Sequence, residues 1–202
     1  NLAMAGLIDR ALLSPPAHIV HPDQVFTVGF EVSAPSGDRT VVSTASYPTY
    51  EAVTNRVPTV AVAAWHHVNM NIGLGTGRVQ VKANGVTGNY FRLLGVQPSL
   101  GRAVVPDDDQ PPVGTPVAVL SHSLWRSAFG GDPGALGQRI QFGALSLEMV
   151  VSLEMVGVMP AGFSGHTAER VDLWLPLSAA MHDTQGCIVR HGWQSSNSAF
   201  AA

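Results

Sequence analysis

The sequence predicts an α+β domain, with α/β layers, in which short helices pack on a mixed sheet. Three observations predict this class. Short apolar runs of strand length alternate with helical patterns, and glycines and prolines separate them. A hydrophobic content of 46% over 202 residues suffices for one substantial core or two small ones. Some candidate strands are apolar throughout and others alternate, so the sheet should be covered unevenly.

Composition excludes several functional classes. Charged residues make up only 12% of the chain, the net charge is −3, and lysines and arginines are scattered, so no basic patch indicates nucleic-acid binding. The single Cys187 cannot form an internal disulfide, and no Cys/His spacing of the zinc type is present. A share of charged residues this low is unusual for the surface of a folded domain, and it indicates binding partners or a nearby membrane.

The first quarter of the chain is expected to form two extended pieces and a helix. Residues 24–33 and 40–43 are rich in β-branched residues and are predicted strands. Ser46 followed by Pro48 predicts a helix N-terminus, and the helix should continue to about Arg56. Its apolar face is expected to contain Tyr47, Tyr50 and Val53.

The next segment is expected to contain two strands and a short helix. Residues 57–65 are nearly all small and apolar, which predicts a strand buried on both faces, whereas residues 66–77 look irregular. Residues 78–86 alternate apolar and polar side chains and predict a strand with one wet face. A helix should follow over residues 90–94 and end at Gly95.

The second half repeats the alternation of strands and short helices. Residues 116–120 predict a buried strand, and Ser121 predicts the N-cap of a helix that residues 130–133 break. The core face of that helix should contain Leu124, Trp125 and Ala128, and a small helix should follow at residues 133–137. Further strands are predicted at residues 139–142, 152–159 and 171–176.

A tandem hexapeptide interrupts this pattern at residues 145–156, where L-S-L-E-M-V is followed by V-S-L-E-M-V. An insertion of six residues is even, so it preserves the alternation of side chains along a strand. A lengthened hairpin or a bulged loop would absorb it. An artefact of cloning or of sequence assembly is an equal alternative.

The polar groups that could carry chemistry favour structural roles. Asp107, Asp108 and Asp109 lack the alternating ligands of a calcium loop, and prolines surround them, which favours a solvated loop. Adjacent His66 and His67 diverge on either a strand or a helix, so they cannot converge on one metal.

Two short motifs resemble catalytic or nucleotide-binding loops only superficially. The glycine-rich residues 73–77 precede a strand instead of a helix and lack Lys-Ser/Thr, which favours a hairpin turn over a phosphate site. Ser164-Gly165-His166 lacks the frame of a nucleophile elbow. We therefore assign no catalytic, cofactor-binding or metal residue, and we expect core anchors at Trp65, Trp125, Trp174, Tyr90 and Phe91.

Four strings in order carry a family resemblance. They are V-T-G-N-Y-F-R-L-L-G-V-Q-P-S-L-G-R (86–102), P-V-A-V-L-S-H-S-L-W (116–125), F-G-G-D-P-G-A-L-G-Q (129–138) and V-G-V-M-P-A-G-F-S (156–164). Upstream of these strings lie H-P-D-Q-V-F-T-V (21–28) and S-Y-P-T-Y (46–50), in the same order as in the family that the strings resemble. The chain resembles the MacB-like periplasmic core domain of FtsX-family ABC-transporter permeases.

The resemblance implies a domain organisation. Residues 1–16 would be the end of a first membrane helix and its exit. Residues 17–183 would be the extracytoplasmic core, a porter-like subdomain with a smaller subdomain inserted at about residues 90–140. Residues 184–202 depart from the family pattern and are interpreted as a divergent or truncated tail, with the chain a fragment of a longer protein.

The resemblance also implies a function. A non-enzymatic domain at the bacterial inner membrane, in the periplasm or outside the cell, would couple ATP-driven motion of membrane helices to export or partner engagement. Its partners would be an ATPase subunit or domain, a second permease copy or pseudo-dimer half, and a periplasmic adaptor, with no cofactor. The alternative is a free-standing secreted ligand-binding or adhesion module with the same fold.

Overall fold

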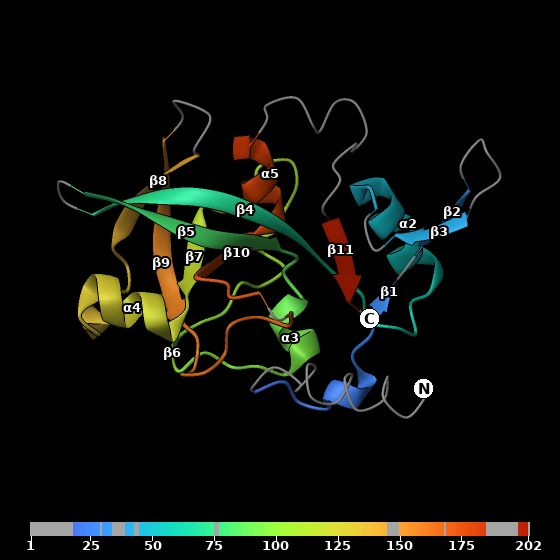
Figure 1. The fold of residues 1–202 in the computed structure, drawn as a ribbon, viewed down its shortest axis with the longest axis horizontal. Coiled ribbons are helices and arrows are strands. Elements are labelled where there is room, and N and C mark those ends of the chain that lie inside the picture. Colours follow the sequence, from blue (N-terminus) through green and yellow to red (C-terminus); the bar gives the residue numbers. More distant parts are fainter. Residues whose placement is uncertain are drawn as a thin grey trace, which may run out of the picture.

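The structure is a computed structural model that describes residues 18–28, 30–33, 39–42, 45–74, 77–144, 150–167, 169–184 and 198–201. Figure 1 shows strands curled into one body with short helices around it. In chain order the elements are η1 (Pro22–Gln24), β1 (Thr27–Val28), β2 (Phe30–Ser33), β3 (Arg39–Val42), α2 (Tyr47–Arg56), β4 (Ala63–Leu74), β5 (Gly77–Val86), α3 (Tyr90–Leu94), β6 (Leu100–Gly101), β7 (Val117–Leu120), α4 (His122–Phe129), η2 (Pro133–Ala135), β8 (Arg139–Ala144), β9 (Val150–Val158), β10 (Leu173–Pro176), α5 (Leu177–Thr184) and β11 (Ser198–Ala201).

Six strands of the large sheet close into a ring. The pairing runs β4–β5–β10–β7–β9, and β8 completes the circle because it pairs with both β9 and β4. The β5–β10 and β7–β9 pairs are parallel, and the other pairs in the ring are antiparallel. A mixed sheet with few short helices confirms the predicted α+β class.

The inside of the ring is the first hydrophobic core. Alternate residues of a strand point to one face of a sheet, so each strand contributes every second side chain to this interior. In β10, for example, Leu173 and Leu175 belong to the interior core, whereas Trp174 between them belongs to the core on the other face. The other interior residues of the strands are Val68, Met70, Ile72, Val81, Ala83, Ala118, Leu120, Ile140, Leu153 and Met155.

Two further cores cover the outside of the ring. Helix α3 places Tyr90, Phe91 and Leu94 on the outer face around Trp174, where aromatic rings stack edge to face. Helices α2 and α5 pack over the start of β4 in a third cluster. That cluster contains Val62, Ala64, Leu177 and Met181, with Tyr47, Tyr50 and Val53 of α2 packed against it as predicted.

The predicted helix ends are confirmed in detail. The Ser46 Oγ accepts a hydrogen bond from the Thr49 N–H at 3.3 Å and caps α2. The Ser121 Oγ accepts one from the Leu124 N–H at 3.1 Å and caps α4. Gly95 adopts the left-handed conformation, with φ 68°, and closes α3.

The predicted strand at residues 57–65 is wrong in position. The Val60 N–H donates to the Val57 carbonyl at 3.1 Å, so a turn occupies residues 57–60 and strand β4 begins only at Ala63. The same strand continues to Leu74 through the segment expected to be irregular. Its alternation of buried residues with Asn69 and Asn71 was the missed signal, because polar side chains on the outer face broke the apolar run.

The hairpin predicted at residues 73–77 is confirmed, because β4 and β5 pair antiparallel with Leu74 opposite Gly77. The second hexapeptide copy forms most of β9, whereas residues 145–149 of the first copy lie outside the described residues. Residues 90–140 contribute strands β6 and β7 to the large sheet, and their boundary as an insertion stays a prediction.

None of the helices in the described part of the chain has the length and apolar character needed to cross a bilayer.

Candidate functional site

The N-terminal arm, residues 18–26, lies against helix α3 and the loop that follows β9. The Val20 N–H donates to the Leu94 carbonyl at 3.0 Å, and the His18 Nε2 lies 2.7 Å from the Ala161 carbonyl oxygen. Ile19 and Val25 pack against the core on the outer face of the ring. Polar and apolar contacts therefore fix the arm to the body of the domain.

Gly95 permits the closest approach between the arm and α3. A Cβ atom at this glycine would lie 2.6 Å from the Val20 Cβ, well inside van der Waals contact, and its φ of 68° strains any L side chain. The residue that ends α3 is therefore also the contact point for the arm.

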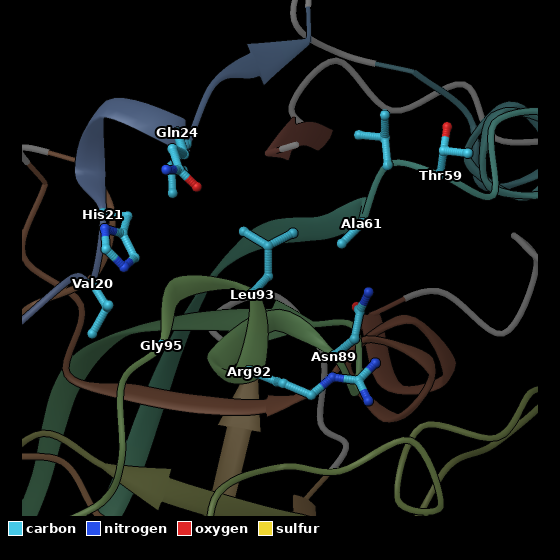
Figure 2. Close-up of a pocket in the computed structure, with 11 residues that line it drawn as sticks. Val20, His21, Gln24, Thr59, Ala61, Asn89, Arg92, Leu93 and Gly95 are labelled. Carbon is cyan, nitrogen blue, oxygen red and sulfur yellow. The ribbon is translucent and has the colours of Figure 1, made fainter.

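A groove with a volume of about 600 Å³ opens between the arm, α3 and the connection from α2 to β4 (Figure 2). Its walls combine apolar side chains with polar ones, among them Arg92 of α3 and Asn89 at the N-cap of that helix. No carboxylate belongs to the described lining of the groove. The lining residues are Val20, His21, Gln24, Val25, Thr59, Val60, Ala61, Asn89, Arg92, Leu93 and Gly95.

The first and last described strands of the large sheet are neighbours. Strand β1 pairs antiparallel with β11, with Thr27 opposite Ala201, and β11 pairs in turn with the start of β4. These strands extend the sheet beyond the ring on the side where the arm leads into β1 (Figure 1). The chain therefore enters and leaves the sheet at one place.

The acidic loop is not solvated, which corrects the prediction for Asp107, Asp108 and Asp109. Asp108 is only 5% exposed. Arg102 forms a bidentate ion pair with it, in which Nη1 contacts Oδ2 and Nη2 lies 3.0 Å from Oδ1. The Val105 N–H also donates to the Asp108 carboxylate at 3.1 Å. Only Asp107 of the three has an exposed side chain.

Asp109 ties together three parts of the fold that are distant in sequence. Its Oδ1 accepts hydrogen bonds from the Ser178 N–H at 2.8 Å and the Ser178 hydroxyl at 2.7 Å, and its Oδ2 accepts one from the Gly88 N–H at 3.1 Å. Burial raises the pKa of Asp109 above its ordinary value, and the bonds from Ser178 and Gly88 oppose that shift. The carboxylate joins the end of β5 to the start of α5.

His166 belongs to a buried cluster that the sequence did not reveal. Its Nδ1 lies 2.7 Å from the Tyr90 hydroxyl oxygen, and its ring stands edge-on to Trp65 with centroids 4.0 Å apart. Burial lowers the pKa of His166 to about 4 and raises that of Tyr90. Both groups are therefore neutral at pH 7, and Ser164-Gly165-His166 contributes packing on this face.

The remaining candidates take structural roles. His66 and His67 are consecutive in β4 and so point to opposite faces of the sheet, and His67 Nδ1 lies 3.0 Å from the Asn84 Oδ1. Among the residues that the structure describes, no three potential ligands gather around a metal position. Trp65 and Trp174 are core anchors as predicted. Trp125 is half-buried, packs against the interior core on the predicted face of α4, and donates its Nε1–H to the Asp132 carbonyl at 2.9 Å.

The sequence profile of the MacB-like periplasmic core domain matches residues 1–198. The chain belongs to this family. The match extends through most of the tail that the sequence pattern alone had set apart. Comparison with curated protein sequences gives no match.

Solved structures of such domains share the fold of this MacB-like domain. A domain ascribed to a permease protein of Porphyromonas gingivalis superposes with a TM-score of 0.62 at 16% identity, covering 91% of this chain and 73% of its own. The periplasmic region of MacB from Actinobacillus actinomycetemcomitans gives 0.61 at 16%, with coverages of 88% and 73%. The extracellular domain of the noncanonic ABC-type transporter YknZ from Gram-positive bacteria gives 0.60 at 13%, with coverages of 88% and 81%.

Proposed function

We propose that this MacB-like domain couples ATP-driven motion of the permease's membrane helices to substrate export or to partner engagement outside the membrane. The domain would be inserted between two membrane helices, on the periplasmic or outer side of the bacterial plasma membrane. It would transmit movement as a packed body and catalyse no reaction itself.

The pairing of β1 with β11 carries this proposal. A domain inserted between two membrane helices must receive the chain and return it at one place, and the first and last described strands lie side by side in the sheet. Strand β11 also pairs with β4, a member of the closed ring. A displacement applied at this point would reach the ring through backbone hydrogen bonds.

The attachment of the arm to the body of the domain supports the same proposal. A domain that transmits motion must be firmly joined to the segment through which the motion arrives. The arm is joined to the body by the Val20–Leu94 hydrogen bond, the His18–Ala161 contact and the packing of Ile19. The closed ring behind it has a packed interior, which resists deformation.

The roles of the buried polar groups favour a non-catalytic domain. The Asp109 carboxylate accepts three hydrogen bonds from Ser178 and Gly88, and Asp108 is paired with Arg102. The His166 imidazole faces Tyr90 and Trp65 inside a core. The two carboxylates and the His166 Nδ1 therefore make contacts within the protein that stabilise the fold.

The partners that this role requires are a cytoplasmic ATPase subunit or domain and a second permease copy or pseudo-dimer half. A periplasmic adaptor protein is a further proposed partner. The transported substrate would be selected by the assembled transporter, and we assign none of the described residues to contact it.

Sequencing the DNA on both sides of this coding region tests the membrane placement. The proposal expects an apolar span of about 20 residues before Asn1 and another after Ala202. Co-purification of the full-length protein with an ATPase would support it further. A secreted protein with a signal peptide and no such spans would contradict it and favour the free-standing binding or adhesion module.

A further inference from the structure

We propose that the groove between the arm, α3 and residues 57–61 docks on the outer surface of the membrane and recognises anionic lipid headgroups. This inference rests on the proposed function, because it requires the domain to be tethered beside a bilayer. It adds a partner, the lipid surface, and a residue that selects its charge, Arg92.

Exposed apolar side chains gather on the two chain segments that form the walls of this groove. Seven large hydrophobic residues are exposed in the described part of the chain, and four of them belong to residues 20–26 and 57–61. These four are Val20, Phe26, Val57 and Val60, which are between 42% and 64% exposed. Exposed apolar residues clustered beside a groove are typical of surfaces that bind a partner or a membrane.

The charge of the groove favours an anionic partner. The whole chain carries a net charge of −3, yet the described lining contains Arg92 and no acidic residue. Arg92 is exposed, and it forms no ion pair with any described carboxylate. Asp23 of η1 is near in sequence but does not line the groove. A guanidinium on an apolar rim matches the phosphate layer of a bilayer, where each basic residue strengthens binding to anionic lipid.

The position of the groove favours a membrane over a soluble protein as the partner. Val20, His21, Gln24 and Val25 of the arm form one wall, and the arm is the segment that would arrive from the first membrane helix. Figure 2 shows His21 and Gln24 on one side of the groove and Thr59 and Ala61 on the other, with Arg92 on α3. In the proposed placement, this wall belongs to the part of the described chain that is nearest in sequence to the first membrane helix.

Vesicle co-sedimentation of the 202-residue chain tests the inference. The probes are vesicles of phosphatidylcholine alone and vesicles that contain an equal part of phosphatidylglycerol, at low and physiological salt. We expect binding to the anionic vesicles that weakens with salt and little binding to the neutral ones. Arg92→Ala should lower the partition coefficient roughly fivefold, and Val60→Asp by roughly tenfold or more.

Matched variants separate the groove from general effects. Val113 is 46% exposed and Val60 44%, so Val113→Asp makes the same change outside the groove. Arg139 is exposed at the start of β8, so Arg139→Ala removes a charge elsewhere. Both controls should keep wild-type binding within about twofold, and thermal unfolding should verify that every variant is folded.

Failure of wild type to bind either vesicle, equal binding to both, or equal loss in the control variants would overturn the inference. None of these results would affect the proposed coupling function, which depends on flanking membrane spans and on ATP-driven movement. Absence of those spans would contradict the coupling proposal, whereas the measured binding to vesicles would stay valid.

Discussion

The carboxylate of Asp109 binds Ser178, a residue 69 positions further along the chain, through the backbone N–H at 2.8 Å and through the side-chain hydroxyl at 2.7 Å. Ser178 lies in the first turn of α5, where backbone N–H groups have no partner within the helix. The acidic loop therefore supplies a cap for a helix that the local sequence leaves uncapped. The same carboxylate accepts a hydrogen bond from the Gly88 N–H, so one side chain positions the start of α5 relative to the end of β5.

Asp109→Ala should destabilise the domain by about 3 kcal/mol, because it leaves two backbone N–H groups and a hydroxyl without their acceptor in a partly buried site. Urea unfolding measures the change in free energy. Asp107→Ala is the control, since that neighbouring side chain is exposed, and it should cost no more than about 0.5 kcal/mol. Equal losses in the two variants would refute a capping role for Asp109.

His166 should make stability depend on pH. Burial lowers its pKa to about 4 in the folded state, whereas an unfolded histidine titrates near 6.5. Between these values the unfolded chain binds more protons, so stability rises with pH and is lost as pH falls from about 6.5 to 4. The full effect is about 3 kcal/mol.

His166→Gln should flatten the stability profile in this window, because the titrating group is gone. Urea unfolding at half-unit steps from pH 4 to 7 measures the slope. His21→Gln alters an exposed histidine and should keep the wild-type profile. An unchanged slope in the His166 variant would show that other groups cause the pH dependence.

Removal of residues 145–150 should leave the fold and register intact. Phe142 pairs with Val151, so the deletion leaves Gly143 and Ala144 as a two-residue hairpin loop between them. The pairs behind it, Gln141 with Ser152 and Ile140 with Leu153, keep their faces. We expect a stability change within about 1 kcal/mol by thermal unfolding. Aggregation or loss of cooperative unfolding would mean that the first repeat is needed for the structure.

The sequence predicted elements with local signals and missed what depends on distant contacts. Ser46, Ser121 and Gly95 mark helix ends through bonds to residues within one turn, and all three were recognised. The closure of the ring depends on β8 pairing with both β4 and β9, and no local pattern encodes a strand with two partners. Strand β4 was misplaced because its outer face is polar.

The candidate site was less predictable for the same reason. Asp108 and Asp109 carry no local sign of burial, since the decisive partners of Asp109 are Gly88 and Ser178. His166 lies 76 positions after Tyr90, so local sequence does not predict their contact. Conversely, the family resemblance was recognisable because glycines and prolines at fixed spacing are read directly from the sequence.

Gly95→Ala should loosen the arm. The new methyl group would lie 2.6 Å from the Val20 Cβ, so Val20 must move and its hydrogen bond to Leu94 should weaken. Hydrogen exchange of the Val20 amide should accelerate at least tenfold. Gly130→Ala is the matched control, because Gly130 also closes a helix with φ 63° but has open space around its Cβ position. That variant carries the same left-handed strain and should leave the Val20 amide protected.

The most direct test of coupling follows a label on the domain in the full-length permease with its ATPase in lipid nanodiscs. Ser123→Cys on the exposed surface of α4, with Cys187→Ser, leaves one cysteine in this domain, and any cysteines elsewhere in the permease and its ATPase are replaced by serine. We predict that ATP shifts the distance from this label to a lipid-bound acceptor in wild type and Gly130→Ala. In Gly95→Ala, ATP hydrolysis should persist while the shift falls to less than half. A label that does not respond to ATP in wild type, or that responds fully in Gly95→Ala, would contradict the account.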